Sequence, residues 1–207
     1  RRPAPPRMRP SREADDRATR SEFRMKVTLH PRAPATLRLP TAPKSIRKGV
    51  PLKHVLGLDA VDCLAHNLGV VLAEFDATSF RADALDGLED FGILERGRKL
   101  ADALWRHLPQ DFSAATNILL QSLTPPLDGS EDAGLSVFFY LPHVCFVAAY
   151  GLDPLHNGGR DPFDVAMAAQ YELTQRFSAE FSIRPFLIRS PDRTLARLLA
   201  WTSDASP

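Results

Sequence analysis

Apolar residues recur at steps of three and four along most of the chain beyond residue 58, which is the spacing of one buried face of an α-helix. This pattern predicts helices over 59–75, 79–88, 93–108, 112–123, 137–149, 162–177 and 191–202. A strand requires alternation with a period of two, and Leu135–Tyr140 comes nearest to that pattern. A helix or an extended lead-in explains Leu135–Tyr140 equally well.

Polar and special residues mark where several of these helices begin and end. Asp59 is placed as an N-cap for the first helix. Both Asp161-Pro162 and Ser190-Pro191 put a capping residue directly before a proline at the first helical position. The most apolar helix ends at Gly151, which we expect to be a left-handed C-cap.

Short connections between amphipathic helices favour antiparallel helical hairpins, and a stack of such hairpins forms an α-solenoid. The connections 124–134 and 153–161 are rich in proline, glycine and acids, so we expect both to be solvent loops. The fold class that follows is all-α. Because the sequence shows no internal period of about forty residues, periodicity by itself does not establish a repeat architecture.

Charge divides the chain into two parts. Residues 1–50 carry 14 Lys/Arg and 4 Asp/Glu, a net charge of +10, together with 8 of the 18 prolines. The remaining 157 residues carry 12 Lys/Arg and 21 Asp/Glu, a net charge of −9. We expect residues 1–49 to be a disordered basic tail rich in proline and arginine, and residues 50–207 to be the helical domain. The tail could hold DNA by releasing counterions, or it could be an extension without a role.

Several classes of site find no support in the sequence. No run of about eighteen apolar residues is present, so no membrane span is expected. Cys63 and Cys145 lie in apolar helical segments, which favours two buried thiols in a cytoplasmic protein over a disulfide. The histidines and cysteines lack metal-ligand spacing, so we expect neither a metal nor another cofactor.

One carboxylate, Glu180, stands in an unusual setting. It lies within a largely aromatic segment, among Phe177, Phe181, Ile183 and Phe186. A lone acid in an apolar wall is costly unless it is paired or used. The alternative is an exposed helix in which Glu180 pairs with Arg176 or Arg184, each four residues away. The residues by themselves leave both interpretations open.

The segment around Glu180 resembles a known family. Residues 176–187 read Arg-Phe-Ser-Ala-Glu-Phe-Ser-Ile-Arg-Pro-Phe-Leu, preceded by Glu-Leu-Thr-Gln and followed two residues later by Ser190-Pro191. They resemble the signature of bacterial DNA alkylation repair proteins of the AlkC type, in the AlkC/AlkD superfamily of HEAT-like repeat DNA glycosylases. Further matches keep the family's order over about residues 50–207: Val50-Pro51-Leu52-Lys53, Leu108-Pro109-Gln110-Asp111-Phe112 and Tyr150-Gly151.

The resemblance implies a HEAT-like α-solenoid curled around duplex DNA, and an N-glycosylase that removes cationic N-methylated bases such as 3-methyladenine. Glu180 matches the family's catalytic-site glutamate. Departure of such a base leaves positive charge on the sugar, and a preorganised carboxylate in a partly dry site would stabilise that charge and position a water. The resemblance further implies that the damaged nucleotide stays in the duplex, without the deep base flipping of other glycosylases.

Residues close to Glu180 have candidate roles as well. Arg176, Arg184 and Arg189 could contact DNA phosphates, although such arginines are more often solvated or ion-paired surface residues. Pro185 lacks a backbone donor, so we expect a kink that aims Glu180 inward, the alternative being a helix end.

Two features depart from the family pattern. The family continues into a basic element with a second active-site glutamate, whereas this sequence stops at Pro207, so we expect an incomplete, N-terminal portion truncated at the C-terminus. The net charge of −9 over residues 51–207 also disfavours unaided binding to DNA.

The leading hypothesis is therefore a DNA alkylation repair glycosylase, or a fragment inactive alone, acting as a monomer on double-stranded DNA that carries alkylated bases. One alternative is a non-catalytic helical-repeat module that binds DNA or a protein partner. Another is an inactive truncated paralogue that folds incompletely, because its last hairpin leaves an apolar surface uncapped.

Overall fold

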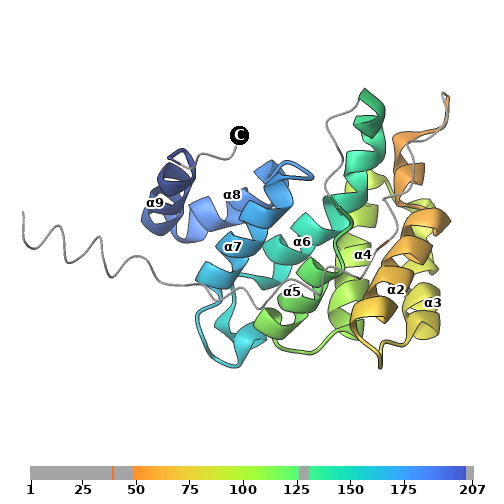
Figure 1. Cartoon of the computed structure of the whole chain (residues 1–207), viewed down its shortest axis with the longest axis horizontal. Coiled ribbons are helices and arrows are strands. Elements are labelled where there is room, and N and C mark those ends of the chain that lie inside the picture. The colour runs from red at the N-terminus through yellow and green to blue at the C-terminus, as the bar shows by residue number, and fades with distance from the viewer. Residues whose placement is uncertain (1–38, 40–48, 126–130, 204–207) are drawn as a thin grey trace, which may run out of the picture. The chain divides into compact units, whose positions relative to one another are not determined.

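The described part of the chain is built from helices. The structure is a computed structural model that describes residues 39, 49–125 and 131–203, with only the backbone described at 131–133. Eight α-helices lie in this part of the chain (Figure 1): α2 Leu58–Val71, α3 Ala77–Leu85, α4 Ile93–His107, α5 Phe112–Gln121, α6 Leu141–Tyr150, α7 Phe163–Thr174, α8 Glu180–Arg189 and α9 Pro191–Trp201. The 3₁₀ helices there are η1 Leu52–Leu56, η2 Leu88–Asp90, η3 Glu131–Tyr140 and η4 Pro154–Asn157. These ranges contain no strand, and the expected all-α class is confirmed.

The expected tail over residues 1–49 lies outside the described residues except at Leu39 and Gly49, so its disorder and the domain boundary stay predictions. Within 49–125 and 131–203, no helix combines the length and the apolar character that a membrane crossing needs.

Local signals explain where several helices begin. The Oδ1 atom of Asp161 accepts a hydrogen bond from the backbone N–H of Phe163, 3.0 Å away. Helix α7 nevertheless begins at Phe163 with Pro162 as its N-cap, one residue later than the sequence predicts. Helix α9 begins directly at Pro191, as the sequence predicts. The expectation for Asp59 is wrong, because the N-cap of α2 is Gly57 and Asp59 lies inside the first turn. A carboxylate in that turn still interacts favourably with the helix dipole.

Gly151 ends α6 for a different reason from the one expected. Its φ is −84° and its ψ is 9°, so it is not left-handed. A Cβ added at Gly151 would lie 2.6 Å from the carbonyl oxygen of Val147 and 2.9 Å from atoms of both Ala166 and Phe112. The glycine is therefore required by the close approach of α5, α6 and α7 rather than by backbone handedness.

The connection expected to be a loop over 124–134 is also partly helical. Residues 126–130 lie outside the described residues, and η3 begins at Glu131 and runs to Tyr140. It is broken at Gly134, where φ is +40° and ψ is −131°. The helix expected over 137–149 is consequently the end of η3 followed by α6.

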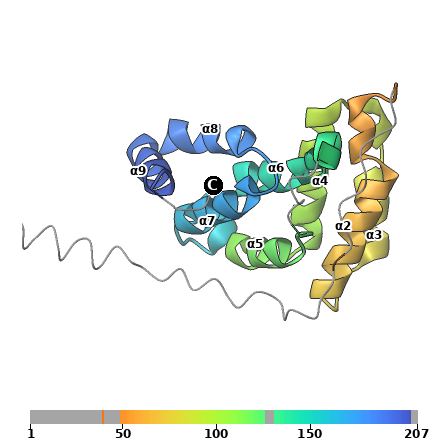
Figure 2. The ribbon, with the colours of Figure 1, turned by 45° about the horizontal axis from the view of Figure 1, so that its top comes forward.

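Helices α4 and α6 pack together at the centre of the fold (Figure 2). Helix α6 also packs on α8, while α2 packs on α3, α5 on α7, and α8 on α9. At Gly97 of α4, an added Cβ would lie 2.7 Å from the Cγ atom of Leu141 in α6. Because Gly97 has no side chain, α4 and α6 can approach each other closely. Helix α8 packs in turn on α6.

A fully buried arginine joins the first elements to this centre. The Arg96 side chain of α4 is inaccessible to solvent, and its guanidinium group donates to four backbone carbonyls and one carboxylate. The acceptors are the carbonyl oxygens of Lys53, Leu56, Phe91 and Glu89, at 3.2, 3.2, 3.1 and 3.5 Å, and the Oε2 atom of Glu89 at 2.9 Å. This network fixes η1 and η2 against α4.

Replacement of Arg96 by methionine should destabilise the fold, because it keeps the apolar stem but leaves several buried carbonyls without donors. We expect the free energy of unfolding to fall by about 3 kcal/mol or more, measured by urea denaturation. Arg98, exposed on the same helix, supplies the control. Arg98→Met should change the stability by less than about 0.5 kcal/mol, and equal effects of the two substitutions would contradict this role for Arg96.

Candidate nucleic-acid interface

Helix α8 is held against α7 by buried polar contacts. The hydroxyl of Ser182, which is fully buried, donates to the Oε1 atom of Gln170 in α7 at 3.0 Å. Phe186, also fully buried, places the same side of α8 in the core. At the first residue of the helix, the backbone N–H of Glu180 donates to the Oγ atom of Ser178 at 3.2 Å. The opposite side of α8 therefore faces away from the core.

That opposite side carries four exposed residues, which we call the α8 outer face: Glu180, Phe181, Arg184 and Ile188. At about 100° per residue these four positions fall within about 100° around the helix axis. Phe181 is 43% exposed, and its ring stacks on that of buried Phe177 with a centroid distance of 5.5 Å. The face thus combines a carboxylate, a cation and an anchored aromatic ring.

The structure distinguishes the two expected environments of Glu180. Of the two interpretations that the sequence leaves open, a partly dehydrated carboxylate in an apolar wall and an exposed helix, the structure agrees with the second, because the Glu180 side chain is exposed. Phe186 lies six residues further on, which is about 240° around the helix, so it points to the core on another side. No ion pair joins Glu180 to Arg184 among the described residues, so the alternative pairing with Arg184 is not formed either.

Arg176 precedes α8 in the chain and is bound within the fold. Its Nε atom donates to the carbonyl oxygen of Thr124 at 2.9 Å, and its Nη1 atom donates to that of Glu172 at 3.3 Å. These bonds tie the segment after α5 to the end of α7. The guanidinium group is half-buried, and the structure gives it an anchoring role in addition to any contact with phosphate.

Arg184 and Arg189 are both exposed on α8, and neither forms an ion pair with a residue of the described ranges. Arg189 lies about half a turn around the helix from Glu180, so it is outside the α8 outer face. The structure therefore places Glu180 and Arg184 one helical turn apart on α8, whereas Arg176 precedes that helix.

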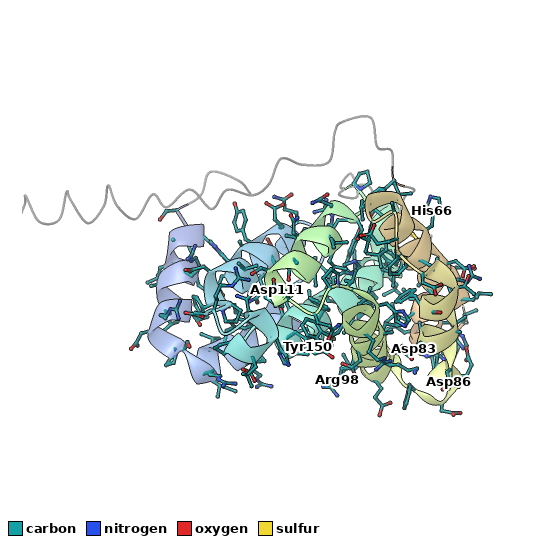
Figure 3. All side chains as sticks on the ribbon, turned by 90° about the horizontal axis from the view of Figure 1, so that it is seen from below. His66, Asp83, Asp86, Arg98, Asp111 and Tyr150 are labelled. Carbon is teal, nitrogen blue, oxygen red and sulfur yellow. The ribbon has the colours of Figure 1, made fainter. Side chains whose placement is uncertain are left out.

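Most other arginines in the described ranges are neutralised by carboxylates. Bidentate bonds of 2.8 and 2.9 Å join Arg106 to Asp83, and Arg160 reaches Asp111 at 2.7 Å. Figure 3 labels the two carboxylate residues, Asp83 and Asp111. Four more arginines have carboxylate partners: Arg81, Arg96, Arg193 and Arg197. Besides the two α8 arginines, the exposed arginine without such a partner is Arg98 of α4. Among the described residues, exposed arginines without a carboxylate partner therefore lie on α8, which has two, and on α4, which has one.

Pro185 lies within α8 and does not end it, because the helix continues to Arg189. The proline cannot donate to the carbonyl of Phe181. The alternative interpretation, that the helix ends at Pro185, is therefore excluded. The influence of Pro185 on the direction of the Glu180 side chain stays a proposal.

A buried polar cluster lies behind α8. The hydroxyls of Thr124 and Tyr140 are hydrogen-bonded to each other, and both residues are completely buried. His143 is 1% exposed, and its Nδ1 atom has no hydrogen-bond partner among the described residues. Burial, reinforced by the positive charge of Arg176, lowers the pKa of His143 to about 3. This imidazole is therefore neutral in the folded protein over the physiological range.

Other reactive groups give little support for a second site. Cys63 and Cys145 are free thiols, as expected, but both are partly buried rather than fully buried. Burial raises the pKa of each to about 11, so neither is a ready nucleophile. No three His, Cys, Asp or Glu side chains of the described ranges lie together as a metal site would require.

The sequence pattern did not reveal two features: the burial of Arg96, which lies in α4 away from this site, and the exposure of Phe181 on α8. The hydrophobic periodicity does not mark Arg96 as buried. In the sequence, its one distinguishing feature is that a cation lies on the apolar side of a helix. The exposure of Phe181 could have been inferred from its distance of five residues from buried Phe186, had the helix start at Glu180 been predicted.

Comparisons with known proteins bear on the fold. No protein-family model matches the sequence. A Bacillus subtilis (strain 168) protein described as uncharacterized, YhaZ, is 29% identical over 154 residues, which are 73% of this chain and 38% of YhaZ. A solved structure, the Pseudomonas fluorescens alkylpurine DNA glycosylase AlkC bound to DNA containing an abasic site analog, is 28% identical with a TM-score of 0.62. That match covers 76% of this chain and 40% of AlkC.

The packed pairs of helices define the class of the protein, an all-helical repeat fold. More particularly, the chain has the AlkC-type fold, which confirms the resemblance carried by residues 176–187. The chain spans about two fifths of the length of these two relatives.

The buried imidazole of His143 should make stability depend on pH. The unfolded chain binds a proton at His143 below its ordinary pKa of 6.5, while the folded protein does so only near 3. Stability present above pH 6.5 is therefore lost as the pH falls toward 3, by up to about 1.4 kcal/mol per pH unit from this group. In urea denaturation at several pH values, His143→Phe should flatten this slope. His66→Gln, at an exposed position, should leave it unchanged, and a slope unaltered by His143→Phe would contradict the assignment.

Proposed function

We propose that this chain acts in the repair of alkylated DNA, as an AlkC-type N-glycosylase or as the part of one that carries the α8 outer face. Its substrates would be cationic N-methylated bases, such as 3-methyladenine, in double-stranded DNA. The protein would act as a cytoplasmic monomer without a cofactor. The observation that carries the proposal is the exposed pair Glu180 and Arg184, on one face of α8, in a chain with the AlkC-type fold.

The chemistry needs few protein groups. A base methylated on a ring nitrogen is cationic and already a good leaving group, so it requires little general acid catalysis. Cleavage of its glycosidic bond leaves positive charge on the sugar, as in glycoside hydrolysis. A carboxylate held close to that sugar stabilises the charge and can orient the attacking water. Glu180 can supply this carboxylate from a fixed helix terminus.

In this proposal the DNA itself provides the dry environment that the free protein lacks. Glu180 is exposed in the structure, which contains no DNA. Docking of a duplex on the α8 outer face would bury the carboxylate between the helix and the deoxyribose. Removal of water strengthens the interaction between opposite charges, because the local dielectric constant falls.

Arg184 would position the duplex for this step. It lies about 6 Å along the helix axis from Glu180, the rise of four residues. A guanidinium group that lacks a carboxylate partner is free to bind a phosphate, and such contacts set the register of a protein on DNA. The stacked ring of Phe181 would cover the adjoining sugar or base edge.

A second candidate function is DNA binding without catalysis. It is favoured by the exposure of Glu180 in the free protein and by the coverage of only 40% of AlkC. The two functions differ in one measurable respect, because the binding module would release no base.

The first prediction concerns catalysis. Glu180→Gln should lower the release of methylated bases from alkylated double-stranded DNA at least about 100-fold, because the amide removes the negative charge. The measurement is single-turnover base release resolved by chromatography, which also reports which methylated base is preferred. Glu74→Gln, at an exposed acid between α2 and α3, is the matched control and should retain full activity.

Equal release by Glu180→Gln and the unsubstituted chain would remove Glu180 from the mechanism. The absence of release from both, with DNA binding intact, would favour the binding module. Pro185→Ala extends the test, because a role in directing Glu180 requires it to lower base release more than the free energy of unfolding. Parallel losses of both quantities would leave Pro185 with a structural role only.

The second prediction concerns DNA affinity. Arg184→Gln should weaken binding to duplex DNA about fivefold and lower the slope of log affinity against log salt by about 1, because one phosphate contact is lost. Fluorescence anisotropy at several salt concentrations gives both quantities. Arg98→Gln removes the same charge from an exposed position on α4 and should leave both nearly unchanged. Matching losses for Arg98 and Arg184 would show that net charge, rather than α8, governs binding.

A further inference from the structure

A buried polar pair joins α7 to the first turn of α8. The hydroxyl of Ser182 donates to the Oε1 atom of Gln170 at 3.0 Å, and the carbonyl oxygen of Ala179 lies 3.1 Å from the same hydroxyl. Both Gln170 and Ser182 are inaccessible to solvent. The Nε2 atom of Gln170 donates to the Sδ atom of Met167 at 3.5 Å. Both polar ends of the glutamine side chain are therefore engaged inside the protein.

Two buried polar side chains at a contact between helices add little to stability. A hydrogen bond formed inside a protein replaces hydrogen bonds to water, so its net contribution is small. Methionine and alanine would fill similar space without the desolvation of an amide and a hydroxyl. A hydrogen bond holds only over a narrow range of distances and angles, whereas apolar packing is not directional. The pair therefore specifies the orientation of α8 relative to α7 in a way that apolar side chains would not.

The first turn of α8 needs an anchor outside the helix. Pro185 lies within the helix and has no N–H group, so the carbonyl oxygen of Phe181 receives no hydrogen bond from that position. One of the bonds that would join the first turn to the remainder of α8 is therefore missing. The turn itself is closed by the N–H groups of Ser182 and Ile183, which donate to the carbonyl oxygen of Ala179 at 3.0 and 2.8 Å. Its Ser182 side chain then ties it to α7.

The rotation of this turn about the helix axis determines where the Glu180 carboxylate points. Ser182 follows Glu180 by two residues, which is about 200° around the axis, so a buried Ser182 places Glu180 on the solvent side. A carboxylate about 6 Å from the axis moves by about 2 Å when the turn rotates by about 20°. A misplacement of about 1 Å at a reacting centre can lower a rate about 100-fold. A small rotation of the turn is therefore enough to impair a reaction at Glu180.

We propose that Gln170 and Ser182 are positioning residues for the glycosylase reaction. Their hydrogen bond fixes the rotation of the first turn of α8 and thereby the direction of the Glu180 carboxylate. The effect on base release rests on the proposed function of Glu180, whereas the effect on the turn does not. Both residues act through Glu180 rather than through contact with DNA, because neither is accessible to solvent.

The test replaces the pair by apolar groups of similar size, in the double variant Gln170→Met with Ser182→Ala. Because both partners are removed together, neither is left buried without the other, and Tm should stay within about 3 °C. Single-turnover base release from alkylated duplex DNA at saturating protein should fall about tenfold or more. The affinity for the same duplex, measured by fluorescence anisotropy, should stay within about twofold, because phosphate contacts govern it.

Amide hydrogen exchange supplies a readout that needs no activity. The N–H group of Ile183 lies in the first turn of α8 and donates to the carbonyl oxygen of Ala179. Its exchange should become about tenfold faster or more in the double variant, because the turn opens locally more often. The N–H group of Leu108, which donates to the carbonyl oxygen of Leu104 at the end of α4, should exchange at its original rate.

Tyr150→Phe is the matched control, because it removes a hydrogen bond between two other helices. The Tyr150 hydroxyl donates to the Oδ1 atom of Asp102 at 2.7 Å and joins α6 to α4. This variant should leave both base release and the exchange of Ile183 unchanged. Ser182→Ala alone should slow base release at a lower Tm, because the Oε1 atom of Gln170 loses its donor. The single substitution keeps the test readable if the double variant does not fold.

An original rate of base release in the double variant would overturn the positioning role, whatever happens to Tm. An equal loss of rate in Tyr150→Phe would overturn it as well, because any lost hydrogen bond would then have the same effect. If the unsubstituted chain releases no base, the proposed function fails separately. Faster exchange of Ile183 in the double variant would in that case still support the anchor on α8, and unchanged exchange would overturn it in every case.

Discussion

The fold depends most on the burial of one positive charge, that of Arg96. A guanidinium group cannot lose its proton inside a protein, so it is tolerated only where its donors are paired. Carbonyls of η1 and η2 and the carboxylate of Glu89 provide these acceptors. The neighbouring residue, Gly97, lets α6 approach α4 from the other side. Two adjacent residues thus join the first elements to the central helix pair, on which α8 is packed.

A second constraint is the pairing of charges over the surface. Net charge alone would suggest a domain that repels DNA, because residues 51–207 sum to −9. The structure shows that the arginines are distributed unevenly with respect to their partners. Arginines with carboxylate partners, on α3, α4 and α9, contribute little to the external electrostatic field. Arg184 and Arg189 of α8 have no carboxylate partner among the described residues. Local compensation, rather than the total, determines which face can receive a polyanion.

Much of the fold follows from the sequence because it rests on local chemistry. Helical periodicity and the Asp161-Pro162 and Ser190-Pro191 start signals located the other helices but not α8, since these signals depend on nearest neighbours along the chain. The reason for a glycine at position 151 was predicted wrongly, because a side chain there would collide with Phe112 and Ala166, which are distant in sequence. Three-dimensional packing supplies that information, and periodicity does not contain it.

The sequence proposes which residues form the candidate site, and the structure supplies their environment. The run 176–187 singled out Glu180 and its flanking arginines, and that choice of residues stays a prediction. The surroundings of these residues depend on the position at which α8 begins. With the helix starting at Glu180, that side chain faces outward and Phe186 faces inward. For the same reason Arg176 falls in the turn before α8, where it binds Thr124 instead of sharing a face with Arg184.

The central claim is that DNA covers the α8 outer face, and hydroxyl-radical footprinting tests it most directly. Phe181 and Ile188 are 43% and 78% exposed in the free protein, so both side chains should be oxidised readily. Addition of duplex DNA containing an abasic site analog should protect these two, while Leu155 and Leu199 remain reactive. Unchanged oxidation of Phe181 and Ile188 at saturating DNA would contradict the account.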